Sequence, residues 1–142
     1  YDILNGGAGN DQLDGGYGSD TYLVGRGMGR DTISNYDPLS GVDVVQFDSS
    51  VNLEDLWFRR DGYNLEVSVI GAADKAVVNY WYLSSEYRVD QFKTSDGKVL
   101  LESQVQNLVD KMASFGVDAG AEMSLSQQQK SELNVLLAAN WK

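Results

Sequence analysis

The chain has 142 residues, with 11 Lys and Arg against 21 Asp and Glu, a net charge of −10, and neither cysteine nor histidine. This composition excludes disulfides, thiolate chemistry, serine–histidine nucleophile pairs and histidine-ligated metals, and its negative field disfavours nucleic acid and anionic membranes as partners. No apolar run is long enough to cross a bilayer. Because the chain opens on Tyr1 without an initiator methionine or a signal peptide, we expect it to be a piece of a longer protein.

The amino-terminal third is built on a nine-residue repeat. Residues 6–14 read GGAGNDQLD and residues 15–23 read GGYGSDTYL, which are adjacent copies of G-G-x-G-x-D-x-U-x, where U is large and apolar. The opening YDILN matches the end of an earlier copy, residues 26–34 (RGMGRDTIS) form a weaker one, and a fourth ends near Asp43. The alternative, a flexible linker or a series of ordinary hairpin turns, would not keep an aspartate and an apolar residue at a constant period.

Each place in the repeat has a physical role. Glycine at the first, second and fourth places permits a tight turn whose carbonyl groups point inward, and the aspartate adds a carboxylate to those oxygens. The apolar place, occupied by Leu13, Tyr22 and Ile33, is expected to be buried between two layers. Mixed carbonyl and carboxylate ligands suit Ca²⁺ better than Mg²⁺ or transition metals. The sequence therefore predicts calcium sites in these turns.

Two copies make one full coil, so each turn is expected to stack on the turn two copies later. This register pairs Asp11 with Asp31, Asp20 with Asp43, and Asp2 with Asp20. Two carboxylates about 5 Å apart repel by about 3 kcal/mol at an effective dielectric constant of about 20. We therefore expect the repeats to be unfolded without metal, and calcium binding and folding to be a single event.

The repeat resembles the calcium-binding β-roll of the RTX (repeats-in-toxin) exoproteins. In that family an ion takes carbonyls from the first and third places plus the aspartate of one turn, and from the second and fourth places plus the aspartate of the next stacked turn. The resemblance implies that one ion is shared by Gly6, Ala8, Asp11, Gly27, Gly29 and Asp31. It implies a second ion, shared by Gly15, Tyr17 and Asp20 with the turn at Gly41 and Asp43. Gly16, Gly18 and Asp2 are further candidate metal ligands of the repeats. Arg26 and Arg30 depart from the family pattern.

Beyond residue 48 the composition becomes that of an aromatic-rich domain. Strands are predicted at residues 44–47, 56–59, 65–70, 76–81, 87–92 and 98–101, separated by residues typical of turns. The alternation along residues 65–69 predicts that Glu66 and Ser68 face water while their apolar neighbours are buried. Five aromatic residues are expected to cover the open end of the stacked repeats as core, rather than to form a sugar- or partner-binding patch: Trp57, Phe58, Tyr80, Trp81 and Phe92.

Two helices are predicted to follow. The first has Ser103 and Gln106 as a capping box and Gly116 as a stop, and its apolar face consists of Val105, Leu108, Val109, Met112 and Phe115. The second is capped by Ser126 and Gln129, and its apolar face consists of Leu133, Leu136, Leu137 and Trp141. Either helix could pack on the preceding strands, and the second could instead bind a partner.

The second half of the chain also resembles a known unit. The stretches DLWFRRDGYNLEVSVIG, NYWYLSSEYRVDQF and SDGKVL are similar to the domain that follows the last repeat block in large RTX proteins, and QNLVDKMASF and LLAANWK look like their C-terminal tails. Together the patterns and the resemblance indicate a mainly β fold: a parallel β-roll of nonapeptide repeats (1–48), a short-stranded β capping domain (49–101) and two C-terminal helices (102–142). The resemblance further implies a monomeric fragment with an uncleaved signal for the type I secretion machinery, exported from a Gram-negative bacterium to the medium or the cell surface.

These patterns predict a calcium-dependent folding module that stays unfolded at the low calcium of the cytosol, threads a secretion channel, and folds outside the cell. The alternative is a calcium-dependent adhesion or receptor-binding module, which predicts exposed tryptophans and a ligand. An enzyme is not expected, because no nucleophile–base or phosphate-loop pattern occurs. The adjacent carboxylates of Glu54 and Asp55 would point to opposite sides of a strand.

Overall fold

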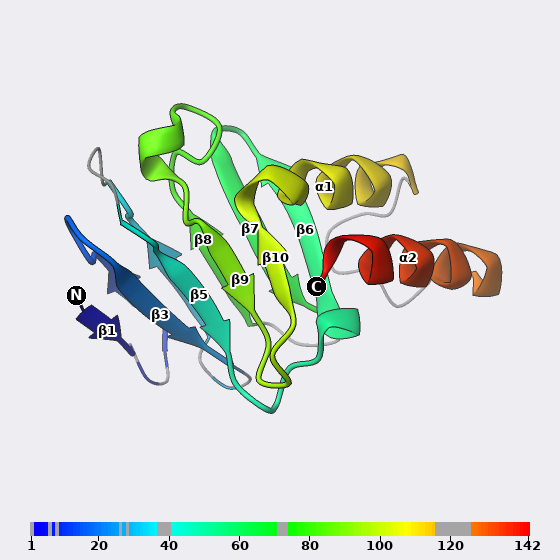
Figure 1. Ribbon diagram of the computed structural model, residues 1–142, viewed down its shortest axis with the longest axis horizontal. Coiled ribbons are helices and arrows are strands. Elements are labelled where there is room, and N and C mark those ends of the chain that lie inside the picture. Colours follow the sequence, from blue (N-terminus) through cyan, green and yellow to red (C-terminus); the bar gives the residue numbers. More distant parts are fainter. Residues whose placement is uncertain are drawn as a thin grey trace.

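The computed structural model of the chain describes residues 2–5, 7, 9–25, 27, 29–36, 41–70, 74–115 and 126–142, and the side chains of Asp2 and Ser85 are outside this description. The described residues form two five-stranded sheets, with two α-helices at the carboxyl end (Figure 1). The fold is therefore mainly β with two C-terminal helices, as predicted.

Each sheet combines strands of the repeats with strands of the later segment. Sheet A contains, in spatial order, β1 (Asp2–Leu4), β3 (Asp20–Val24), β5 (Val44–Phe47), β9 (Gln91–Lys93) and β10 (Val99–Leu101). Sheet B contains β2 (Gln12–Leu13), β4 (Arg30–Ile33), β8 (Lys75–Val78), β7 (Asn64–Val69) and β6 (Leu56–Asp61). The connections include three short 3₁₀ helices: η1 (Leu53–Asp55), η2 (Ser85–Tyr87) and η3 (Glu102–Gln104).

The strands of the repeats pair in parallel with the strand two elements further on. β1 pairs with β3 and β3 with β5 in sheet A, while β2 pairs with β4 in sheet B. Parallel neighbours need a crossover connection, and here the crossover passes through a strand of the opposite sheet. The later segment continues both sheets in parallel, because β9 pairs with β5 and β8 with β4. The predicted stacking of each turn on the turn two copies later is confirmed for these strands.

The hydrophobic core lies between the two sheets. Leu13, Tyr22 and Ile33, the apolar places of the repeat, are 7%, 0% and 0% exposed, as predicted. Farther along, the rings of Phe58 in β6 and Phe92 in β9 pack edge to face with their centroids 5.6 Å apart. The same core continues into the helices, so burial of apolar surface holds the repeat strands and the carboxyl end together.

β7 is buried on both faces, so the prediction that Glu66 and Ser68 face water is wrong: they are 7% and 8% exposed. The strand lies between β6 and β8, and long side chains of those neighbours cover its polar residues. Trp57 is opposite Ser68, and the Lys75 ammonium forms an ion pair with Glu66 Oε1 at 3.0 Å. The polar residues of this central strand are thus shielded from water by side chains of the two neighbouring strands.

The aromatic residues predicted to form the core are buried with one exception. Trp57, Phe58, Trp81 and Phe92 are 0–2% exposed. Tyr80 is 47% exposed, so this part of the prediction is wrong. Its backbone has a φ of 60°, in a turn that follows β8, and its ring lies against that of Tyr87 with centroids 5.2 Å apart. Because this turn and η2 interrupt the chain, β8 and β9 are shorter than predicted.

The first helix, α1 (Val105–Ser114), packs on β6 with Val105, Leu108, Val109 and Met112 buried. Its predicted capping box at Ser103 and Gln106 is wrong, since the N-cap residue is Gln104 and its side chain makes no capping hydrogen bond. The reason is that η3 leads directly into α1, so a 3₁₀ turn supplies the first backbone partners. The predicted stop, Gly116, lies outside the described residues.

The second helix, α2 (Gln127–Asn140), lies beside α1 (Figure 1). Its capping box is confirmed: Gln129 N donates to Ser126 Oγ at 3.1 Å, and Ser126 N donates to Gln129 Oε1 at 2.9 Å. Its predicted apolar face is also confirmed, because Leu133, Leu137 and Trp141 are buried and Leu136 is partly buried against the core. No helix in the described part of the chain is sufficiently long and apolar to span a membrane.

Candidate calcium site

Two aspartates of the repeat meet in sheet B. Asp11 and Asp31 each come one residue before a pair of opposed residues, Gln12 in β2 and Thr32 in β4. Asp11 N donates to Asp31 Oδ1 at 3.1 Å, and Thr32 N donates to Asp11 O at 2.8 Å. The predicted juxtaposition of Asp11 and Asp31 is therefore confirmed.

Each of these carboxylates has one buried oxygen atom. Asp31 is 0% exposed, and the Oδ2 atoms of Asp11 and Asp31 are buried with no hydrogen-bond partner among the described residues. Burial raises the pKa of the Asp31 carboxyl above its usual value; the Asp11 N–H opposes this shift, while the charges of Asp11 and Asp74 add to it. Anionic oxygens buried without donors are costly, so the pair fits a bound cation.

The backbone of the described turns has glycines at positive φ angles and at a close contact between turns. Gly16 and Gly18, at the second and fourth places of one copy, have φ angles of 69° and 101°, which side chains with a Cβ adopt only at a cost. A Cβ at Gly29 would lie 2.8 Å from the carbonyl oxygen of Gly9 in the turn stacked on it. Glycine thus permits a close approach of successive turns, and carbonyl oxygens beside carboxylates are the ligands that Ca²⁺ prefers.

In sheet A, Asp20 and Asp43 are neighbours as predicted, with Asp2 opposite Asp20 on the other side. Asp20 N donates to Asp43 Oδ1 at 2.9 Å. The second oxygen, Asp43 Oδ2, accepts a hydrogen bond from Asn35 Nδ2 at 3.0 Å. Both oxygens of Asp43 therefore have protein donors, whereas one oxygen of Asp31 has no donor among the described residues.

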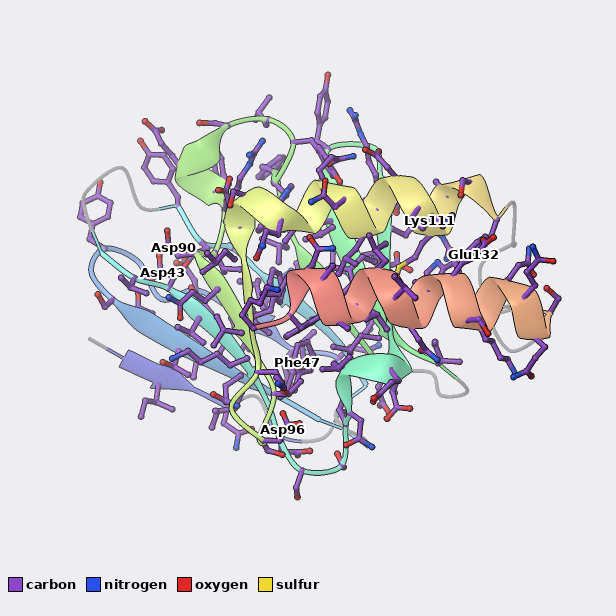
Figure 2. All side chains as sticks on the ribbon, turned by 45° about the vertical axis from the view of Figure 1, so that its right-hand side comes forward. Asp43, Phe47, Asp90, Asp96, Lys111 and Glu132 are labelled. Atoms are coloured by element: carbon purple, nitrogen blue, oxygen red, sulfur yellow. The ribbon has the colours of Figure 1, made fainter. Side chains whose placement is uncertain are left out.

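Asp90 extends the aspartates of sheet A beyond the repeats. Its Oδ2 accepts the N–H of Asp43 at 2.8 Å, its own N–H donates to Asp43 O at 2.9 Å, and Figure 2 shows the two residues beside each other. Asp90 is not predicted as part of a repeat because no glycines precede it. A weaker signal was present, since Asp90-Gln91-Phe92 repeats the D-x-U ending of the nonapeptide.

Asp74 extends sheet B in a different way. It lies one residue before β8 and is 8% exposed. Its Oδ1 accepts the N–H of Gly29 at 2.9 Å and its Oδ2 accepts the N–H of Gly27 at 3.1 Å. The segment around Asp74 carries neither the glycines nor a large apolar residue in the U place, so sequence reasoning had no signal for it.

The other predicted ligands are only partly described. Gly6, Ala8 and the side chain of Asp2 lie outside the described residues. A Cβ on Gly15 would lie 2.5 Å from Asp20 Oδ2, so this turn passes close to the carboxylate, and the side chain of Tyr17 is 60% exposed. Among the described residues no three or more carboxylate, histidine or cysteine side chains gather as a metal cluster. An ion at these turns would therefore need backbone carbonyls to complete its shell.

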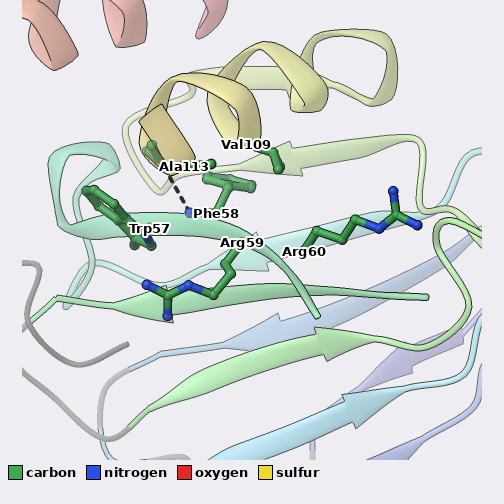
Figure 3. Close-up of a pocket in the computed structure, with 7 residues that line it drawn as sticks. Trp57, Phe58, Arg59, Arg60, Val109 and Ala113 are labelled. Atoms are coloured by element: carbon green, nitrogen blue, oxygen red, sulfur yellow. Dashed lines mark hydrogen bonds between the residues drawn. The ribbon is translucent and has the colours of Figure 1, made fainter. Parts of the chain in front are cut away.

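A separate pocket of about 120 Å³ lies where α1 packs on β6 (Figure 3). It is lined by Trp57, Phe58, Arg59, Arg60, Val109, Met112 and Ala113. The N–H of Phe58 donates to the sulfur of Met112 at 3.1 Å, the contact that is dashed in Figure 3. This lining has no acidic group, so the pocket is not part of the candidate calcium site.

Comparison with known proteins finds calcium-binding relatives, although the family match lies outside the repeat turns. The family model described as "Haemolysin-type calcium binding protein related domain" matches residues 64–104. The "Iron-regulated protein FrpA" of Neisseria meningitidis serogroup C is 36% identical over 118 residues, which cover 80% of this chain and 10% of FrpA. The chain thus spans about a tenth of the length of this curated relative. Both similarities support a relationship to RTX-type calcium-binding proteins.

Proposed function

We propose that the chain is a Ca²⁺-dependent folding module and the C-terminal type I secretion region of a large extracellular RTX protein. In this proposal residues 1–48 form a calcium-binding β-roll, residues 49–101 cap it, and residues 102–142 carry the secretion signal. The chain is unfolded in the cytosol and folds outside the cell. Its similarity to RTX-type calcium-binding proteins favours such a non-catalytic module.

The pair formed by Asp11 and Asp31 is the observation that carries the proposal. Two carboxylates stacked at this site, each with a buried oxygen lacking a donor among the described residues, destabilise the fold that brings them together. A divalent cation between the turns converts that repulsion into attraction. Because the site exists only when β2 and β4 are paired, the free energy of binding becomes free energy of folding. The parallel pairing of alternate strands, β1 with β3, β2 with β4 and β3 with β5, supports a β-roll as the architecture.

Calcium levels determine where the module folds. Extracellular calcium modules bind at about 10⁻⁴–10⁻³ M, so the sites stay empty in the cytosol and the chain remains able to thread a channel. In the folded state Leu133, Leu137 and Trp141 are 5%, 1% and 2% exposed. A signal in these residues is therefore accessible to the secretion machinery only before folding. The folded module is a monomer that is released or held at the surface of a Gram-negative bacterium, with calcium ions as its ligands.

Circular dichroism tests the proposal directly. In chelator the far-UV spectrum of the chain should be that of an unfolded polypeptide, and millimolar Ca²⁺ should convert it to a β-rich spectrum. Asp11→Asn combined with Asp31→Asn should abolish or strongly weaken this response, because the ion loses both carboxylates. A matched control is Asp61→Asn combined with Glu54→Gln, which removes two exposed charges. A complete β spectrum in chelator, or equal responses in the two double variants, would contradict the proposal.

The alternative function, a calcium-dependent adhesion or receptor-binding module, predicts exposed tryptophans. Trp57, Trp81 and Trp141 are 1%, 2% and 2% exposed and belong to the core. Their burial favours the folding module.

A further inference from the structure

Asp74 holds a turn of the repeats from outside the repeats. Its carboxylate accepts two backbone hydrogen bonds from one turn, from Gly29 N at 2.9 Å and from Gly27 N at 3.1 Å. Its own carbonyl accepts the N–H of Val69 at 3.0 Å, which anchors Asp74 to β7. The side chain therefore joins the later segment to a turn that the sequence assigns to calcium binding.

The turn that Asp74 contacts has another turn of the repeats on one side only. On one side lies the preceding turn, where Asn10 Oδ1 accepts the N–H of Arg30 at 2.9 Å and Asp11 stacks on Asp31. On the other side the register places Ala76, fully buried, opposite Asp31. The stack of aspartates in sheet B thus ends at Asp31. The carboxylate of Asp74 takes the place of a further turn, and it faces N–H groups.

The stack of aspartates in sheet A ends in a comparable way at Asp90. Its carboxylate accepts the N–H of Asp43 at 2.8 Å, and its carbonyl accepts the N–H of Glu102 at 2.9 Å. Glu102 also forms an ion pair with Arg88 at 2.8 Å. Asp90 is therefore fixed by the segment that follows the repeats, as Asp74 is.

We infer that Asp74 and Asp90 are positioning residues, which close the last turn of each stack of aspartates through backbone N–H groups and without a cation. The inference rests on the proposed function, and it adds to that function the place in the fold where assembly of the turns begins. Hydrogen bonds to a carboxylate are shorter and stronger than those between neutral groups, so the later segment can hold the last turns in their final geometry. The turns that require calcium then stack on this preformed end.

Calcium titrations of the full chain, followed by far-UV circular dichroism, test the inference. Asp74→Ala should raise the midpoint calcium concentration about tenfold, because two hydrogen bonds to a charged acceptor are lost, and Asp90→Ala, which loses one, about threefold. Asp61→Ala is the matched control, since it removes an exposed carboxylate at the end of β6; its midpoint should stay within about twofold of the original, because no hydrogen bond to a turn is lost.

Two further measurements separate positioning from metal ligation and from general loss of structure. Isothermal titration calorimetry should give the same number of bound ions for Asp74→Ala and the original chain. At saturating calcium, hydrogen exchange should accelerate at Gly27 N and Gly29 N in Asp74→Ala, with the amides of β6 and β7 unchanged.

The outcomes are distinguishable. A midpoint equal to that of Asp61→Ala overturns the inference, and so does the loss of one bound ion, which would make Asp74 a ligand. If Asp74→Ala does not fold at saturating calcium, Asp74→Asn, which keeps one acceptor oxygen, decides by the same criteria. If the original chain has the same spectrum with and without calcium, the proposed function fails, and hydrogen exchange at Gly27 and Gly29 still decides the role of Asp74.

Discussion

Asn35 connects three segments of the chain through one buried amide. It is 0% exposed and accepts a hydrogen bond from the Tyr22 hydroxyl at 2.6 Å. Its Nδ2 donates to Asp43 Oδ2 at 3.0 Å and to the carbonyl of Arg88 at 3.2 Å, and the Tyr22 hydroxyl accepts the N–H of Gly15 at 3.0 Å. A buried polar network stabilises a fold only while each member remains paired.

Replacing Asn35 should therefore be costly. We expect Asn35→Ala to lower the free energy of unfolding by about 2–3 kcal/mol in millimolar calcium, because the Tyr22 hydroxyl and Asp43 Oδ2 each lose a buried partner. Urea unfolding monitored by tryptophan fluorescence measures the change. Asn134→Ala, on the exposed side of α2, is the control and should change stability little. A loss below about 0.5 kcal/mol in Asn35→Ala would show that the network is not structural.

Tyr82 links stability to alkaline pH. Burial raises the pKa of its hydroxyl above the usual 10.0, the Arg60 guanidinium opposes the shift, and Asp110 adds to it. The folded chain thus holds this proton to higher pH than the unfolded chain does, so the free energy of unfolding should fall as pH rises from about 10 through the folded pKa. Tyr82→Phe should reduce this decrease, as measured by urea unfolding at several pH values.

The same variant should not lose stability at neutral pH. The Tyr82 hydroxyl is buried with no hydrogen-bond partner in the described ranges, and phenylalanine removes that unsatisfied group. Tyr63→Phe, at a side chain that is 59% exposed, is the control. An identical alkaline decrease in Tyr82→Phe and the original chain would refute the assignment.

At the scale of elements, α2 packs against the core with only one of its faces. Leu137 is 1% exposed, whereas Val135 is 73% exposed two residues earlier. The helix is also held by an ion pair between Lys111 of α1 and Glu132 of α2 at 3.4 Å, and Figure 2 shows this pair between the helices. Because such an exposed pair contributes little, apolar burial holds the helix.

Alanine substitutions on the two faces of α2 test which face packs against the core. Leu137→Ala should lower the free energy of unfolding by about 2–4 kcal/mol, since it leaves a cavity in the core. Val135→Ala, its matched control on the same helix, should stay within about 0.5 kcal/mol of the original chain. Thermal and urea unfolding in millimolar calcium provide the comparison. Equal effects at the two positions would mean that α2 is not docked as described.

At the scale of the whole molecule, the repeats depend on the segment that follows them. β4 and β5 have β8 and β9 as parallel partners, and the core between the sheets continues into β6, β7 and the helices. Loss of that segment would expose the edge of each sheet and the open end of the core. Short strands with glycine-rich turns bury too little apolar surface to offset the entropy of ordering them.

A peptide of residues 1–50 should accordingly stay disordered at calcium levels that fold the full chain. Far-UV circular dichroism of the two in the same millimolar calcium makes the comparison. The full chain is the matched control, because it joins the same residues to residues 51–142, and it should fold alone at that calcium concentration. A β-rich peptide with the calcium midpoint of the full chain would show that the later segment has no nucleating role.

Much of the candidate site could be predicted because its information is local. The repeat, read with two copies to each coil, placed Asp11 beside Asp31 and Asp20 beside Asp43, and its apolar place put Leu13 in the core. The cap of α2 at Ser126 is equally local, since one hydrogen-bonded turn determines it. The assignment of calcium to these turns stays a prediction, as does the division into domains at residues 48 and 101.

Other features depend on segments that are distant in sequence. Asp74 reaches a turn more than forty residues earlier because β8 pairs with β4. Glu66 is buried because its strand lies between β6 and β8, where Lys75 of β8 forms an ion pair with it. Tyr80 lies outside the core because its backbone turns after β8.

The sequence by itself determined the spacing of the carboxylates, their oxygen-only chemistry and the apolar faces of strands and helices. A repeating pattern specifies these features because it fixes which residues lie on the same face of an element or at the same place in successive turns. Only the tertiary structure decided which aspartates end the two stacks and which polar side chains are shielded. Those outcomes are set by the pairing of repeat strands with strands of the later segment, and the repeat pattern does not encode that pairing.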